Sequence, residues 1–542
     1  MLLFITYHGG DMMSLSTRQL VDIPEHTVYS KKDGVKYVYL ITKSFRNAKG
    51  QPDNKRISIG KLDEESGKLI PNMNYYELFQ KEPPMNLPNI VRKCGTYAVC
   101  RKMADNLGLT KTLKKAFPDE YKEVLTGAHY MLTSGSVMYY LDDWLDETIS
   151  FNPDAMSDVS IGRIFKEITE ENKNIFFREW FKNKANKEFI AYDVTSISSY
   201  AKGLDNVEFG YNRDKEKLPQ INYGMYFGEK SRLPFYYKVY PGSIVDKTYC
   251  EYMIDGTDWL DFKKAYFVMD KGFFTEDNLK LITRNGHRFM ITVPPSLKLY
   301  KQLVDKNKDD IINNIDCKMK DRLVYCKKVE DNSYGFRMNA HIFYNQEKAL
   351  DNAGAFYTKL ETMMADISKM KELPPKGSSY YDYFTLTEKD GYILAAKKND
   401  AIKAALARCG FFIIAETAFN KTSEEVLQIY ANRDSIEKCF DDLKNEIDLN
   451  RIRCSKDETA NGKFFVAFIS LILLSQLRKS LAQYKIKDKT TLKKILNELD
   501  KIKIVYDSSK PDNYRMLNPL TKKQKDILNS LDMNEDIFKN LV

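Results

Sequence analysis

The sequence predicts an α/β protein whose central part is a mixed β-sheet with flanking helices. Two short apolar runs, residues 189–192 and 265–269, have the length and composition of buried strands. Residues 423–447 instead repeat their apolar positions at helical spacing, which predicts an amphipathic helix. A chain of 542 residues can bury several cores, so we expect several domains.

Residues 1–85 are expected to form a small, basic, β-rich region. The predicted elements are two strands and the turn between them, at residues 36–42, 56–59 and 50–54. From Lys31 to Lys61 nine lysines and arginines stand against two acids, a local charge of +7 that could neutralise phosphates. Lys55 and Arg56 are candidate DNA contacts within it, although a solvated hairpin with ordinary surface lysines explains the pattern equally well.

Residues 86–185 are expected to be helical. Apolar residues recur at helix-like spacing over 97–107 and 161–180. The sequence alone does not single out a recognition helix among them.

The central sheet is expected to come from two distant segments, residues 186–295 and 411–485. The first segment predicts a strand into Asp193, a hairpin, a helix, a strand into Asp270, and then another helix and strand. The interval 296–410 is far longer than one helix and one strand need, so we expect a largely β insertion there. Residues 486–542 are lysine-rich with Leu and Ile at helical spacing, which predicts a C-terminal helical region.

Acidic and basic side chains are expected to meet at one edge of this sheet. Asp193 and Asp270 each follow an apolar run, and ligands of open α/β sheets collect at the carboxyl ends of strands. The predicted helix carries four polar residues spaced by three, four and seven positions, namely Tyr430, Arg433, Glu437 and Lys444. At about 100° per residue these four project within an arc of roughly 60°, so they form one polar stripe beside the apolar face.

Three carboxylates gathered at one edge repel one another unless cations neutralise them. The candidate catalytic and metal-binding residues are Asp193, Asp270 and Glu437. Oxygen ligands suit Mg²⁺ or Mn²⁺, and two such ions act on phosphodiesters by stabilising the attacking and leaving oxygens. Arg433 and Lys444 would then grip phosphates, the first by a fork and the second as a point charge, and Tyr430 could hydrogen-bond a phosphate oxygen.

Each of these residues also has a structural interpretation. Arg433 and Glu437 form an i, i+4 pair of a kind that stabilises any solvated helix by a few tenths of a kcal/mol. Asp193 and Asp270 could simply begin turns or cap helices. Taken together, these interpretations do not explain why both aspartates follow apolar strands and why the polar stripe lies beside a core face. The functional interpretation is therefore preferred.

The composition is compatible with this chemistry and does not decide it. A formal charge of +9 permits a polyanionic partner. The eight cysteines include no CxxC pair and no histidine at metal spacing, which argues against a zinc site. With no secretory start, free thiols predict a reducing cytoplasm. The longest apolar stretch, residues 464–474, is too short to cross a bilayer, so no membrane partner is expected.

Three blocks of the chain, in the right order, resemble the DDE transposases of bacterial insertion sequences, in particular the group with the YREK signature. That signature is Tyr, two residues, Arg, three residues, Glu, six residues and Lys, and the polar stripe meets it without a gap. Asp193-Val194-Thr195-Ser196 with residues 208–215 resembles the first block, and Asp270 with residues 271–274 resembles the second. Residues 448–453 resemble the basic loop that follows the glutamate helix, which makes Arg451 and Arg453 candidate DNA contacts. The resemblance covers residues 186–485.

The resemblance implies a ribonuclease H-like catalytic core with two Mg²⁺ or Mn²⁺ ions. It also implies a DNA transposase that binds terminal inverted repeats, cleaves at them and joins the freed ends to target DNA. Such an enzyme would act as a homodimer on paired ends, in a bacterial cytoplasm and at the nucleoid when bound, with residues 86–185 binding the ends. Two alternatives stay open: a ribonuclease H-like, metal-dependent DNA endonuclease without strand transfer, and a catalytically silent DNA-binding relative.

Overall fold

The structure is a computed structural model that describes residues 20–541 apart from short segments. Those segments are 33–34, 47–49, 80–89, 153–155, 157, 185–187, 202, 246–247, 249, 252, 255–259, 261–263, 321, 390, 418–419, 488 and 508–513. The chain divides into two compact units. The first unit comprises Met1–Trp180, Ser199–Leu204 and Asp441–Val542, and the second comprises Phe181–Ser198 and Asp205–Phe440. Both aspartates and the glutamate of the predicted site therefore belong to the second unit.

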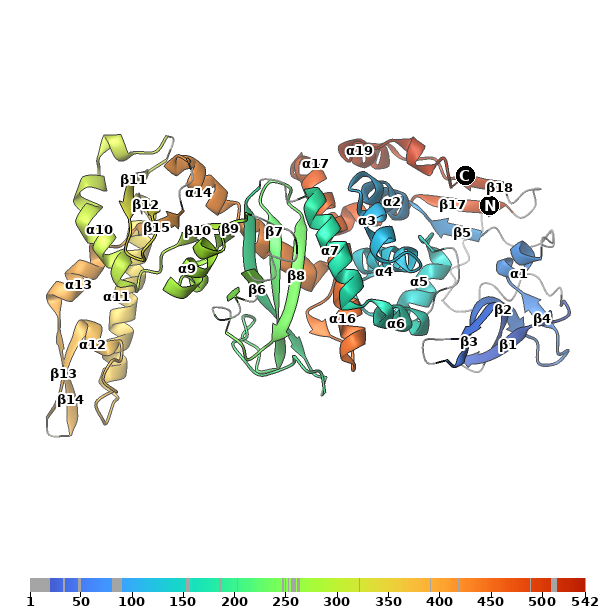
Figure 1. Cartoon of the computed structure of the whole chain (residues 1–542), viewed down its shortest axis with the longest axis horizontal. Coiled ribbons are helices and arrows are strands. Elements are labelled where there is room, and N and C mark those ends of the chain that lie inside the picture. Colours follow the sequence, from blue (N-terminus) through green and yellow to red (C-terminus); the bar gives the residue numbers. More distant parts are fainter. Residues whose placement is uncertain are drawn as a thin grey trace, which may run out of the picture. The chain divides into compact units, whose positions relative to one another are not determined.

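The second unit is built around one large mixed sheet (Figure 1). Its strands are β6 (Ile190–Ser199), β7 (Gln220–Gly228), β8 (Pro234–Pro241), β9 (Tyr266–Met269), β10 (Arg288–Thr292), β11 (Val324–Asp331), β12 (Met338–Asn345) and β15 (Phe411–Glu416). They lie in the order β11-β12-β15-β10-β9-β6-β7-β8. β6, β7 and β8 are antiparallel neighbours, β9 is parallel to both β6 and β10, and β15 is antiparallel to β10. This mixed α/β arrangement is consistent with a ribonuclease H-like core.

Apolar strands bury the middle of this sheet. Every residue of β7 is buried, and so is every residue of β6 except Asp193. Helix α9 (Glu276–Arg284) contacts β10, and α14 (Ser423–Ala431) contacts β10 and β11. Val426 of α14 packs in a buried cluster with residues of the sheet, among them Val268, Met290, Phe343 and Ile414. The helix begins with a capping box formed by Thr422 and Glu425, so its start on the sheet is well defined.

Residues 296–410, expected to be a largely β insertion, contain more helix than strand. The helices are α10 (Lys298–Ile311), α11 (Gln346–Ile367), α12 (Tyr380–Tyr383) and α13 (Asn399–Leu406). β11 and β12 belong to the large sheet, whereas β13 (Phe384–Lys389) and β14 (Tyr392–Lys397) form a separate hairpin packed against α11 (Figure 1). The expectation is wrong for two reasons. Helix α11 alone spans 22 residues, and the lysines and aspartates of α10 hide the apolar positions that it buries.

The first unit contains a small N-terminal sheet. Its strands, in spatial as well as chain order, are β1 (Thr27–Lys32), β2 (Val35–Arg46), β3 (Pro52–Leu62) and β4 (Leu69–Pro71). All neighbours are antiparallel. Helix α1 (Met73–Leu78) covers one face, and its Tyr75 and Tyr76 bury Val38 and Ile59. The opposite face of β2 and β3 is therefore the outer face of the small sheet.

The rest of the first unit is mainly helical. Its helices are α2 (Gly95–Asn106), α3 (Leu109–Ala116), α4 (Tyr121–Ser134), α5 (Leu141–Glu147), α6 (Asp158–Glu167), α7 (Glu170–Lys184), α16 (Asp457–Ser480), α17 (Ala482–Lys487), α18 (Leu492–Leu499) and α19 (Lys522–Ser530). Residues 486–542, expected to be helical, also contribute β17 (Lys503–Asp507) and β18 (Tyr514–Leu517). β17 pairs with β5 (Ile90–Lys93). Because its partner strand comes from the other end of the chain, no local sequence pattern reveals this pairing.

Helix α16 is long and apolar enough to cross a membrane, judged by length and composition among the described residues. Within the structure, however, 89% of its most apolar window is buried. It packs against α4 and α6 of the same unit. These contacts are those of a core helix.

Gly462 sets how closely α16 approaches α6. A Cβ added at this position would lie 2.0 Å from the main-chain oxygen of Phe165, so the backbone would have to move. We expect Gly462→Ala to lower the free energy of unfolding by about 1–3 kcal/mol, the usual cost of overpacking, as measured by chemical denaturation. Gly354→Ala on α11 is the control, because nothing lies within 4 Å of its added Cβ. It should be neutral or stabilising by up to about 1 kcal/mol, and equal losses in both variants would contradict the close approach.

Candidate active site

The two aspartates lie side by side because of the sheet register. β6 and β9 are parallel, and their pairing ends with Tyr192 opposite Met269. The next residue on each strand is Asp193 and Asp270, so the two carboxylates emerge at the same level of adjacent strands. Asp270 directly follows the end of β9, as predicted. Asp193 does not end its strand, because β6 continues to Ser199 through antiparallel pairing with β7.

The third carboxylate comes from α15 (Asp434–Asp441), and one guanidinium connects all three. The nitrogen Nη2 of Arg433 lies 2.8 Å from Oε1 of Glu437 and 3.9 Å from Oδ1 of Asp270. Its Nη1 lies 3.6 Å from Oδ2 of Asp193. The Arg433 side chain is 11% exposed, against 16%, 38% and 55% for Asp193, Asp270 and Glu437. The structure therefore brings together the three predicted acids around a nearly buried positive charge.

The single helix predicted over residues 423–447 is wrong. α14 ends at Ala431, a turn follows, α15 begins at Asp434, and Asp442–Glu446 forms a π-helical segment. The carbonyl of Asn432 in the turn accepts a hydrogen bond from Arg232 at 3.3 Å, and its side chain donates to Glu229. Both partners come from the turn between β7 and β8. Tertiary contacts, and not a local helix breaker, therefore hold this bend and set the direction of Arg433.

Tyr430 supports the arginine from α14. The guanidinium of Arg433 lies over the Tyr430 ring, 5.6 Å from its centroid, a cation–π arrangement. Burial raises the pKa of the Tyr430 hydroxyl to about 12, against smaller opposing effects of Thr292 and Arg433. Tyr430 is thus a neutral, partly buried neighbour of the carboxylates at ordinary pH. Its predicted contact with a phosphate stays a prediction.

Arg213 is a second basic residue near the site, for which no role was predicted. Burial raises the pKa of Asp193 to about 6, while the Val194 backbone N–H and the positive charges of Arg213 and Arg433 lower it and Asp270 raises it. Arg213 lies in the turn after buried Asn212, whose side-chain NH₂ donates to Ser198 at 3.0 Å. Its position next to Asn212, in the block of residues 208–215 that resembles the family's first block, is the signal that could have identified it.

The donor set fits a hard divalent cation, because three carboxylates supply oxygen ligands alone. In the described part of the chain, however, no three His, Cys, Asp or Glu side chains are already gathered as a metal cage. Arg433 provides the compensating charge in the arrangement that the structure shows. Its Nε is buried without a hydrogen-bond partner among the described residues, so this donor is left available.

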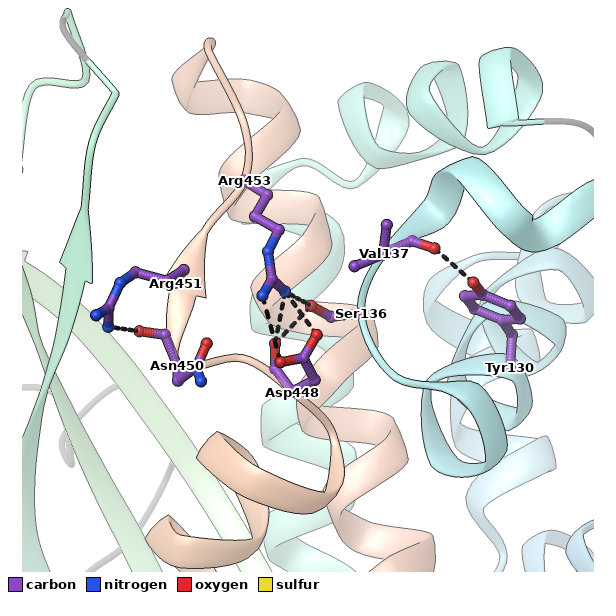
Figure 2. Close-up of polar contacts among 7 residues, drawn as sticks. All are labelled: Tyr130, Ser136, Val137, Asp448, Asn450, Arg451 and Arg453. Atoms are coloured by element: carbon purple, nitrogen blue, oxygen red, sulfur yellow. Dashed lines mark hydrogen bonds and ion pairs between the residues drawn. The ribbon is translucent and has the colours of Figure 1, made fainter.

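The remaining predicted DNA contacts belong to the first unit. Lys444 lies in the π-helical segment, and Arg451 and Arg453 follow it. Figure 2 shows that Arg453 is engaged within the protein: its Nη1 lies 2.7 Å from Oδ2 of Asp448 and 3.3 Å from Oγ of Ser136. Arg451 donates to the Asn450 carbonyl at 2.9 Å. Their role with DNA stays a prediction, and Arg453 also ties two segments of this unit together.

Comparison with known proteins assigns the chain to a family. Residues 184–473, more than half of the chain, match the transposase DDE domain. Among solved structures, the cryo-EM structure of the piggyBac transposase synaptic complex with hairpin DNA is similar at 9% identity and a TM-score of 0.34, covering 80% of this chain and 76% of that chain. No curated protein matches. The matched segment contains both aspartates and the glutamate, and the chain belongs to the family of proteins with a transposase DDE domain.

Proposed function

We propose that the protein is the DNA transposase of an insertion sequence of the YREK group. In this proposal it binds terminal inverted repeats, cleaves DNA at them and transfers the freed strand to target DNA. One observation carries the assignment: Arg433 contacts Asp193, Asp270 and Glu437 within 4 Å, so three acids from separate elements converge at one place. The family match supports a transposase function for the segment that contains them.

Asp193, Asp270 and Glu437 would hold two Mg²⁺ or Mn²⁺ ions through their carboxylate oxygens. When bound, such ions stabilise the attacking and leaving oxygens of phosphodiester cleavage. The three carboxylates then no longer need Arg433 as their counter-ion. Its planar fork is released to bind a phosphate oxygen near the cut, and Tyr430 keeps the guanidinium plane oriented.

The partners and location follow from the same proposal. The DNA is double-stranded, both at the terminal repeats and at the target. A homodimer would pair the two ends, and the protein would act in the bacterial cytoplasm, at the nucleoid when bound. These statements rest on the resemblance of the three sequence blocks.

The proposal is tested with labelled duplexes that carry the ends of the element encoding the chain. In Mg²⁺ we expect cleaved products and products joined to a target plasmid, and in EDTA neither, because the cations that would stabilise the attacking and leaving oxygens are removed. Gel electrophoresis resolves the two product types. Cleavage without joining in several target sequences would favour the metal-dependent endonuclease, and end binding without cleavage in either condition would favour the silent binder.

A further inference from the structure

The part of β2 and β3 that extends beyond the other strands of the N-terminal sheet is a two-stranded ribbon. We define the β2–β3 ribbon as residues 42–46 and 52–56. β1 pairs with β2 as far as Leu40, and β4 pairs with β3 from Gly60 onward, so neither covers the ribbon. Residues 42–46 are all exposed. Figure 1 shows β2 and β3 as the long central strands of this small sheet.

The ribbon begins at an irregularity in the pairing. The register shifts between Ile41 and Lys43, which leaves Thr42 as an extra residue, and the Thr42 hydroxyl donates to the Lys55 carbonyl at 3.2 Å. Such a bulge bends a strand and increases its twist. At the far end, Nη1 of Arg46 donates to the Gly50 carbonyl at 2.7 Å. Both ends of the ribbon are therefore fixed, so it presents its side chains on a defined backbone.

The two faces of the ribbon differ in chemistry. Lys43 lies directly opposite Lys55 on one face, a like-charge pair that destabilises a sheet. The other face carries Ser44 opposite Asn54, with Arg46 and Arg56 on either side. Asp53 is the ribbon's acid, and it lies on the lysine face, 3.8 Å from Arg163 of α6. The Ser–Asn–Arg face thus combines positive charge with hydrogen-bonding side chains and bears no acid.

We propose that the β2–β3 ribbon enters the major groove of the terminal DNA, with Ser44, Asn54, Arg46 and Arg56 facing the base edges. The major groove is about 12 Å wide and admits a two-stranded β-ribbon. Five residues per strand span roughly 17 Å, about five base pairs. Arginine pairs with guanine and asparagine with adenine by two hydrogen bonds each, so this face has the residue types that read sequence.

Binding to DNA phosphates along the same groove would account for two lysines facing each other on the ribbon. Lys43 and Lys55 have flexible side chains long enough to reach the groove walls, and phosphates would remove the repulsion between them. The Ser–Asn–Arg face continues into the sheet, with Arg56 over the Tyr39 ring at 5.0 Å and Lys61 over the Tyr37 ring at 5.6 Å. These rings hold the two cations in place at the base of the ribbon.

This inference rests on the proposed function, and full-length protein tests both separately. Fluorescence anisotropy would measure binding to a labelled 30-base-pair duplex of the element's end and to a scrambled duplex, over a range of salt concentrations. We expect Asn54→Ala/Arg56→Ala to weaken end binding by about tenfold to several hundredfold while changing scrambled binding little. Lys43→Ala/Lys55→Ala should weaken both duplexes alike and reduce the salt slope by about two.

Two further variants keep the test interpretable. Lys493→Ala/Lys494→Ala removes two exposed lysines from α18, which has no proposed DNA contact, and should leave both affinities unchanged. Arg56→Lys keeps the charge but loses the fork, so it should lower the preference for the end and leave the salt slope intact. Circular dichroism melts establish that each variant is folded.

The outcomes separate the two proposals. Unchanged end affinity in the folded ribbon variants, with wild-type protein still cleaving ends, overturns the ribbon assignment and leaves the proposed function standing. Absence of any end binding by the wild-type protein overturns the proposed function. Tighter binding of a single-stranded RNA than of the end duplex, lost in the same variants, would reassign the ribbon to RNA and overturn the major-groove assignment.

Discussion

Replacing Glu437 with glutamine should abolish Mg²⁺-dependent cleavage of the DNA ends while leaving end binding nearly intact. The substitution removes one anionic ligand from the proposed two-cation site, which supplies several kcal/mol of transition-state stabilisation. We therefore expect a loss on the order of 10³-fold or more, since each 1.36 kcal/mol is a factor of ten. The measurement is single-turnover cleavage of a labelled end duplex, with affinity determined in parallel by anisotropy.

The structure indicates that this variant will fold. The Glu437 side chain is 55% exposed and contacts Arg433, whereas Ile436, Cys439 and Phe440 on the other face anchor α15 in the core. Glu424→Gln in the first turn of α14 is the matched control, because this exposed carboxylate lies outside the site, and it should cleave at the wild-type rate. Cleavage by Glu437→Gln within a few-fold of wild type would remove Glu437 from the proposed chemistry.

Replacing Arg433 with glutamine should have two opposite effects. Without divalent cations the three carboxylates lose their common counter-ion, so the variant should be less stable than the wild type. Mn²⁺ should then raise the stability of the variant more than that of the wild type, because in the variant the cation does not compete with the Arg433 guanidinium for the carboxylates. Thermal unfolding measured against Mn²⁺ concentration gives both stabilisations. Each protein gains about 2.7 kcal/mol at a hundredfold excess over its own dissociation constant, so the protein that binds more tightly gains more at any one concentration.

The same variant should cleave poorly in spite of tighter metal binding. Loss of a phosphate-binding arginine at a phosphoryl-transfer site costs about 10³-fold or more where that residue stabilises transition-state charge. Arg433→Lys keeps the charge without the fork and should show wild-type metal dependence but reduced cleavage. An identical Mn²⁺ response in wild type and Arg433→Gln would contradict the exchange of guanidinium for cations, whatever the cleavage rate.

The sequence singled out the three acids and the arginine that the structure brings together, but it gave neither their arrangement nor a role for Arg213. Apolar runs before Asp193 and Asp270 predicted two strands, and helical spacing placed Glu437 beside a core face. A helical wheel, however, treats Arg433 as a side chain pointing to a ligand. In the structure the guanidinium of Arg433 instead lies against the carboxylates, because their negative charge attracts it. Two of these carboxylates, Asp193 and Asp270, come from strands far away in the sequence, so the helix pattern alone does not reveal them.

The broken helix shows the same limit of local patterns. Ala431, Asn432, Arg433 and Asp434 include neither proline nor glycine, and asparagine and aspartate occur both in turns and on solvated helices, so the local pattern does not decide for a turn. The bend depends on Arg232 and Glu229, which lie 200 and 203 positions away from Asn432. In the insertion, by contrast, β11 and β12 follow one another in the chain and pair from Val324 opposite Asn345 to Asp331 opposite Met338, so their pairing is local.

Because Asp193 lies inside β6, the number of residues in this strand is strictly constrained. Parallel pairing with β9 holds the residues before Asp193, and antiparallel pairing with β7 runs from Ile190 to Ser198, so the backbone is held on both sides of the acid. Deleting or adding one residue in this strand would turn the acid to the opposite side of the sheet. Evolution can therefore lengthen the neighbouring loops freely, whereas the spacing within β6 has to stay constant for as long as the acid is needed.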